Sequence, residues 1–265
     1  MTGTVPGLTI VCMGISCVVG YAIPIVLFFY FRKKKNADIV PFFVGCAVML
    51  IFALILESAV HQVVLASAAG EKILNNTWLY ALYGGLMAGL FEETGRFIAF
   101  KTVLRKYREK DINALMYGAG HGGFEAAVIL GVSMVYNIVI ACMINSGNVS
   151  AITDSLSGEG LRQMQAVIDT MTNTSSLFFL IGILERLFAV MIQLSLSVMV
   201  WFAAKNKWYL YLAAILIHLI VDAVSVILSQ NQVPVLVIEA VVGIMAALTA
   251  VIAKMVWDVN VGKES

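Results

Sequence analysis

Residues 78–100 read WLYALYGGLMAGLFEETGRFIAF, an apolar run with two acids and a base near its end. A helix needs roughly 20 such residues to cross a bilayer, so this run is long enough. Glu92 and Glu93 both neighbour Arg96, because side chains three or four residues apart share a helix face. One Glu–Arg pair would be explained by a buried ion pair that fixes helix packing. The second glutamate has no such partner, and it favours a general base in a polar site.

The rest of the chain is also apolar. Of its 265 residues, 61% are hydrophobic and 12% are charged, whereas soluble domains have about 45–50% and about 25%. We therefore predict an all-α polytopic transmembrane helix bundle in the cell membrane, with residues 1–265 forming a single integral-membrane domain. The net charge of +1 gives no reason to expect a nucleic-acid partner. The four cysteines form no CxxC motif and suggest no disulfide framework.

Hydropathy predicts about seven spanning helices. The predicted spans are 8–31, 39–69, 78–100, 112–144, 176–204, 207–228 and 234–257. Basic residues cluster at the ends of the first, third, fifth and seventh spans. These four clusters together contain 13 of the 17 Lys and Arg. The positive-inside rule then puts the N-terminus outside and the C-terminus in the cytoplasm.

Two further polar groups lie in predicted spans. Tyr117, His121 and Glu125 are spaced on one helical face, and four glycines surround the histidine. Glycine permits close approach of a neighbouring helix or of a substrate backbone. His218 and Asp222 are one turn apart, so the aspartate can hold or polarise the imidazole. For each group alone, polar contacts between packed helices are an equally good explanation.

The predicted depths of the three groups agree. At 1.5 Å per helical residue, Glu93, His121 and His218 lie about 10, 14 and 16 Å from the cytoplasmic ends of their spans. Purely structural pairs would have no reason to share a depth. We therefore expect the three groups to meet in one functional site, within a motif-bearing core of about 78–228.

Other features carry weaker predictions. Gly85 and Gly89 form a small-residue surface against which span 112–144 is expected to pack. Residues 161–171 are expected to form a short amphipathic helix. Glu57 and His61 are interpreted as a local contact one turn apart. Glu185 and Arg186 form a further candidate pair, with Gln193 on the same predicted span.

The motifs Glu-Glu-x-x-Arg, aromatic-x-x-x-His and His-x-x-x-Asp follow one another on successive core helices. In this order they resemble the superfamily of CaaX prenyl endopeptidases and bacteriocin-processing enzymes (the CPBP or Abi type). The resemblance is greatest to its YhfC-like branch of intramembrane metalloproteases. It extends more distantly to the PrsW proteases and to the APH-1 subunits of gamma-secretase.

The resemblance implies roles for individual residues. The catalytic set would be Glu92, Glu93, His121, His218 and Asp222, in which one glutamate activates water and the last pair steadies the oxyanion. Arg96 and Tyr117 match supporting positions of the family's motifs. From their spacing alone, the further supporting candidates are Glu125, Glu185, Arg186 and Gln193. YhfC-like sequences often have a histidine near the position of Gln193.

The cofactor remains open at this point. Two histidines with carboxylates could bind zinc, and Glu93, His121, His218 and Asp222 are the candidate ligands. The zincin spacing His-Glu-x-x-His is missing, and a metal-free glutamate mechanism fits equally well.

The sequence thus predicts an intramembrane peptidase whose partners are membrane lipid and a membrane-embedded or lipidated peptide. Two alternatives are a proton-coupled transporter, whose relay would use the same residues, and a non-catalytic scaffold, which the resemblance to APH-1 allows. No paired broken helices indicate the inverted repeat of many transporters.

Overall fold

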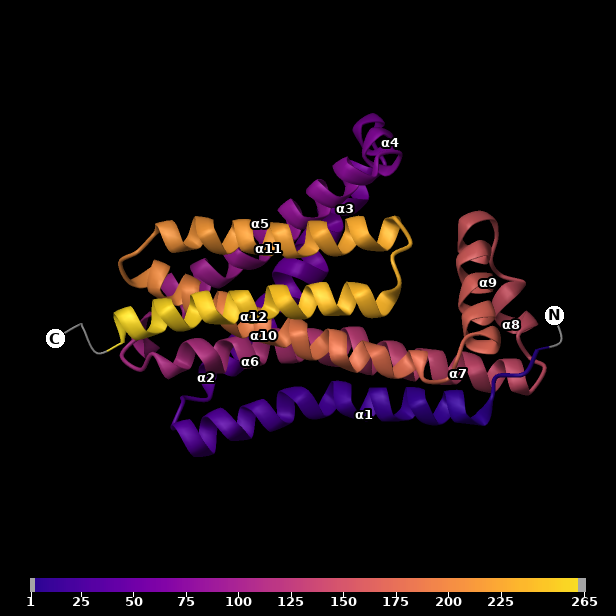
Figure 1. The fold of residues 1–265 in the computed structure, drawn as a ribbon, viewed down its shortest axis with the longest axis horizontal. Helices are drawn as coiled ribbons and strands as arrows, with labels where there is room; N and C mark the ends of the chain where they lie inside the picture. The colour runs from indigo at the N-terminus through magenta and orange to yellow at the C-terminus, as the bar shows by residue number, and fades with distance from the viewer. Residues whose placement is uncertain (1–2, 262–265) are drawn as a thin grey trace. The chain divides into compact units, whose positions relative to one another are not determined.

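The computed structural model describes residues 3–261, and this part of the chain is helical without strands (Figure 1). The all-α prediction is confirmed. Within residues 3–261, six helical segments are long and apolar enough to cross a membrane, as a multi-pass protein requires. They are Gly7–Lys34, Val40–Leu65, Ile112–Asn145, Phe178–Lys205, Tyr209–Gln230 and Val235–Asn260. Each coincides with a predicted span, while the side on which each terminus lies stays a prediction.

The remaining predicted span is helix α5, Thr77–Lys101. Asn76 caps it, since its Oδ1 accepts hydrogen bonds from the backbone N–H groups of Trp78 and Leu79 at 3.0 and 3.1 Å. Its 25 residues are long enough to span. Because it carries Glu92, Glu93 and Arg96, it is less apolar than the six segments above.

The chain divides into two compact units. The first consists of the described residues up to Ile23 and of Ala126–Arg186. The second consists of Pro24–Glu125 and of the described residues from Leu187 onward. Helices α1 (Gly7–Phe29) and α10 (Phe178–Lys205) contribute to both units. The single-domain assignment of residues 1–265 stays a prediction.

The first unit contains the beginning of α1, the elements that follow α6 and the first residues of α10. Its further elements are η4 (Ala127–Val132), α7 (Ser133–Asn145), α8 (Ser150–Thr153) and α9 (Gly158–Asn173). Helix α9 confirms the helix predicted for residues 161–171, and it packs on α7. Ile168 and Met171 are its buried residues.

The second unit holds most of the predicted motifs. Its elements are η1 (Tyr30–Lys34), α2 (Val40–Val48), η2 (Met49–Glu57), α3 (Ser58–Leu65), α4 (Ala68–Leu74), α5, η3 (Arg105–Tyr107), α6 (Ile112–Ala126), α11 (Tyr209–Gln230) and α12 (Val235–Asn260), together with most of α10. In the apolar 18-residue stretch of α10, 72% of the residues are buried, against 22–28% in the corresponding stretches of the other five segments. Helix α10 is therefore central, and the others present apolar faces of the kind that lipid requires.

Helix α5 packs most extensively on α11 (Figure 1). A Cβ atom added to Gly85 would lie 2.5 Å from the carbonyl oxygen of Leu219, and one added to Gly89 would lie 2.9 Å from that of Ile215. The small-residue surface of Gly85 and Gly89 therefore packs on α11, and the expectation that span 112–144 packs there was wrong. Close backbone contact is the usual role of such surfaces between membrane helices.

The glycines around His121 likewise allow close helix crossings. A Cβ on Gly120 would lie 1.9 Å from the carbonyl oxygen of Phe42 in α2. A Cβ on Gly122 would lie 2.8 Å from the Cβ of Gln193 in α10. Neighbouring helices, and not open space for a substrate backbone, occupy these positions. The crossings hold His121 at the junction of α2, α6 and α10.

Candidate active site

The first branch of the site joins α5, α6 and α10. The Nε2 atom of His121 lies 2.9 Å from Glu92 Oε2 in a hydrogen bond. The amide nitrogen of Gln193 donates to the same oxygen of Glu92 at 2.9 Å and to Glu125 Oε2 at 3.0 Å. Three helices are thus tied together by one amide and one imidazole.

The second branch joins α5 and α11. Arg96 Nη1 donates to both carboxylate oxygens of Glu93, at 2.9 and 2.7 Å. The Nδ1 atom of His218 lies 2.8 Å from Glu93 Oε1, and its Nε2 lies 3.6 Å from Asp222 Oδ2. Glu93 is therefore held by a guanidinium and an imidazole from two different helices.

Gln193 connects the two branches, because its amide oxygen accepts a hydrogen bond from Arg96 Nη2. The result is one network of eight side chains from four helices of the second unit. Tyr117 lies beside this network: its ring centroid is 5.9 Å from that of His121 and 5.9 Å from the guanidinium carbon of Arg96. The predicted meeting of the three motifs therefore occurs.

The network is buried and rich in acids. Glu93, Arg96 and His121 are 0% exposed, whereas the side chain of Asp222 is 37% exposed. The network combines four carboxylates with one guanidinium and two imidazoles.

Part of the hydrogen-bonding capacity near Glu92 is unused. Among the described residues, His121 Nδ1 and the Tyr117 hydroxyl are buried without a hydrogen-bond partner. Both hydrogen bonds of Glu92 fall on its Oε2 atom, although an ionised carboxylate can accept at both oxygens. The Oε1 atom of Glu92 is therefore available to a water molecule or a substrate group.

The side chains of the network are of the types that bind zinc, but they are not arranged as a zinc site. Carboxylates and imidazoles are common zinc ligands, and the unpartnered Nδ1 of His121 is a free donor atom. However, no three His, Cys, Asp or Glu side chains within residues 3–261 are grouped so as to hold a metal ion. Of the four candidate ligands, His218 contacts Glu93 and Asp222, while His121 pairs with Glu92. The network in this arrangement does not form a zinc centre, and a metal ion stays a prediction.

Glu57 extends the site beyond the predicted motifs. It pairs with His61 at 3.1 Å, and His61 Nδ1 bonds the Tyr83 hydroxyl at 2.9 Å. Glu57 is 9% exposed and lies close enough to Glu92, His218 and Asp222 for electrostatic interaction. The local interpretation of the Glu57–His61 contact was therefore incomplete. Glu57 ends the π-helical segment η2, and such irregular turns are frequent at functional sites.

Glu185 and Arg186 belong to the first unit. There, Arg186 Nη2 donates a hydrogen bond to Glu185 Oε1, so the predicted pair exists. Gln193, which the sequence placed on the same span, belongs to the second unit and its network.

Fold and network together define a class: a multi-pass membrane protein whose helices enclose carboxylates and imidazoles in one hydrogen-bonded cluster. A comparison with protein families makes the assignment more specific. The profile of the family described as "YhfC intramembrane metalloprotease" matches residues 19–243, and the chain belongs to this family.

A relative supports the assignment. The chain is 31% identical over 243 residues to a Bacillus subtilis (strain 168) protein described as "Uncharacterized membrane protein YhfC". The alignment covers 91% of this chain and 93% of the relative. No solved structure matches the chain.

Proposed function

We propose that the protein is an intramembrane peptidase that hydrolyses a peptide bond in a membrane-embedded or lipidated peptide. The observation that carries the proposal is the single buried network in which His121 and Gln193 both bond one carboxylate oxygen of Glu92 and leave its other oxygen without a hydrogen bond. Membership of a family described as metalloproteases supports the same reaction class. A bound metal ion would supply Lewis-acid activation of water or carbonyl, but no step below depends on one.

The two glutamates have different roles in this proposal. Glu93 accepts from Arg96 at both oxygens and from His218 at one, so it positions the helices. Glu92 is the general base, because its Oε1 is left for water. Glu92 takes a proton as the water oxygen bonds to the substrate carbonyl carbon. The same proton then passes to the leaving nitrogen as the C–N bond breaks, which yields a carboxylate and an amine.

His121 and His218 have supporting parts. His121 orients the Glu92 carboxylate through Nε2. His218, placed between Glu93 and Asp222, donates in its protonated form to the oxyanion of the tetrahedral intermediate. Oxyanion donors of this kind typically contribute about 10²–10³-fold to the rate of acyl transfer.

Cleavage in proteoliposomes tests the proposal. The purified protein is incubated with two peptide pools, one of single-span transmembrane peptides and one of peptides ending in a farnesylated cysteine, and new termini are identified by mass spectrometry. We expect cleavage by the wild type and none by Glu92→Gln or His121→Ala, while Ser195→Ala on α10 should cleave normally. Equal cleavage by all variants would refute the assignment. Proton flux without peptide, lost in the same variants, would favour the transporter.

A further inference from the structure

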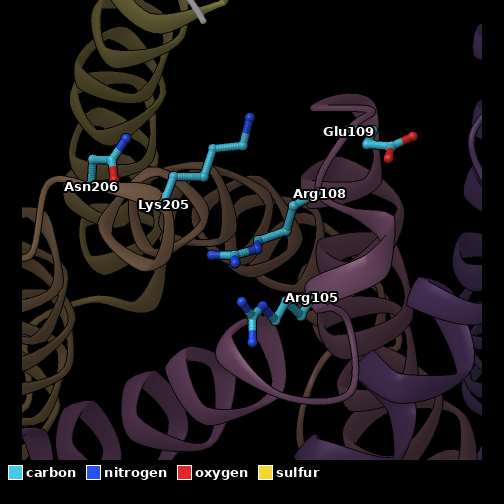
Figure 2. A pocket seen from close by; sticks show the side chains of 5 residues that line it. All are labelled: Arg105, Arg108, Glu109, Lys205 and Asn206. Atoms are coloured by element: carbon cyan, nitrogen blue, oxygen red, sulfur yellow. The ribbon is translucent and has the colours of Figure 1, made fainter.

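A second polar feature lies at the end of the second unit where the α5–α6 loop meets the last residues of α10. Here a pocket of about 380 Å³ is lined by Arg105, Arg108, Glu109, Lys205 and Asn206 (Figure 2). The guanidinium groups of Arg105 and Arg108 point into the same space, while the carboxylate of Glu109 is directed away from them. None of these residues belongs to the buried network.

The positive charge of the pocket comes mainly from its two arginines. Arg108 Nη1 donates to the carbonyl oxygen of Ala204 at 2.7 Å, which fixes this side chain against the end of α10. Arg105 is exposed. Lys205 is less available to an anion, because its Nζ lies 2.8 Å from Asp111 Oδ1.

The surroundings place the pocket at the level of lipid headgroups. It adjoins the end of the apolar helix α10, next to which Trp208 and Tyr209 are 66% and 55% exposed. Exposed Trp and Tyr are typical of the membrane–water interface. Val103, two residues before Arg105, is 58% exposed, so apolar surface lies on the same loop.

We propose that this pocket binds the phosphate group of an anionic phospholipid. Arginine is well suited to phosphate because its planar guanidinium donates two parallel hydrogen bonds. Basic pockets between membrane helices are typical sites for anionic headgroups, and the volume lies in the range of small-molecule sites. The apolar residues beside the pocket would contact the glycerol and acyl chains, which free phosphate lacks. This binding site is independent of the proposed peptidase activity.

Native mass spectrometry of the full-length protein in dodecylmaltoside micelles tests this inference. The protein is given equal amounts of palmitoyl-oleoyl phosphatidylglycerol and phosphatidylcholine, and the bound lipid is counted. We expect the wild type to prefer phosphatidylglycerol and Arg105→Gln to bind it about five-fold more weakly, the usual contribution of one basic residue at a membrane surface. Lys106→Gln is the matched control, because Lys106 is the adjacent exposed cation and does not line the pocket.

Each other outcome overturns the inference. Equal binding of the two lipids would remove the headgroup preference. An equal loss in Lys106→Gln would point to diffuse surface charge and not to a pocket. Displacement of phosphatidylglycerol by an equal concentration of inorganic phosphate would show a free-anion site. The Arg105 side chain is exposed, so its replacement should leave the melting temperature unchanged, and that measurement accompanies the titration.

Discussion

Replacement of Gln193 by methionine should disconnect the two branches of the network. Methionine has similar length and fills the same space, but it cannot hydrogen-bond in the same way. The change removes the bonds from Gln193 to Glu92 and Glu125, at 2.9 and 3.0 Å, and the bond that it accepts from Arg96. All three partners are charged groups, and Arg96 is fully buried.

The expected loss of stability follows from these three bonds. A hydrogen bond to a charged group contributes about 1.5–3 kcal/mol in soluble proteins, but polar contacts in membrane proteins average about 0.6 and reach about 1.7 kcal/mol. Three bonds at the membrane values give about 2–5 kcal/mol. The lower end applies if water enters beside Glu125, which is only partly buried.

Unfolding in mixed micelles of dodecylmaltoside and increasing dodecyl sulfate, followed by tryptophan fluorescence, measures this loss. Ser195→Ala is the control, since Ser195 Oγ bonds only Met191 O of its own helix in the described chain, at 2.7 Å. Such bonds stabilise a helix little. A Gln193→Met variant within about 0.5 kcal/mol of Ser195→Ala would refute the view that Gln193 holds the network together.

The remaining predictions concern the paired glutamates and the helix crossings. Glu93→Gln should destabilise the protein by about 3–5 kcal/mol in the same unfolding assay, because it leaves Arg96 buried without its counter-charge, whereas Glu92→Gln should abolish cleavage with a smaller effect on stability. The reverse pattern would exchange the two assigned roles. Gly120→Ala should cost at least about 1–3 kcal/mol, because its Cβ would meet a backbone carbonyl at 1.9 Å. A Cβ added at Gly84 has no neighbour within 4 Å, so Gly84→Ala should increase stability by up to about 1 kcal/mol through helix propensity. Equal effects of the two changes would contradict the close crossing of α6 and α2 at Gly120.

Local patterns were sufficient to predict the helices. Hydropathy depends on composition within one segment, so the six apolar segments and α5 appear where the sequence predicts them. The ion pair of Glu93 with Arg96 and the contact of His218 with Asp222 are likewise local, at three and four residues' spacing. The common depth of the motifs also predicted that they would meet.

Partners distant in sequence could not be predicted in this way. Gly85 and Gly89 of α5 pack on α11 and not on α6, because any apolar helix with a suitable groove can pack against a small-residue surface. The sequence analysis named Gln193 as a supporting residue, but its bonds to three charged groups depend on how α10 is rotated about its axis. Glu57 was assigned to a local contact for the same reason, since its neighbours Glu92 and Asp222 are on other helices.

The central claim is that the three polar motifs share one buried site. Its most direct test measures the contact of each histidine with a carboxylate while the protein is in a membrane. The chain has three histidines, and each lies within 3.1 Å of a different glutamate. Solid-state NMR on protein with ¹⁵N-labelled histidine and ¹³C-labelled glutamate, with His61→Phe and His121→Phe to assign signals, measures these contacts. We predict strong nitrogen–carboxyl dipolar coupling for both His121 and His218. Absence of coupling at either histidine would contradict a shared buried site.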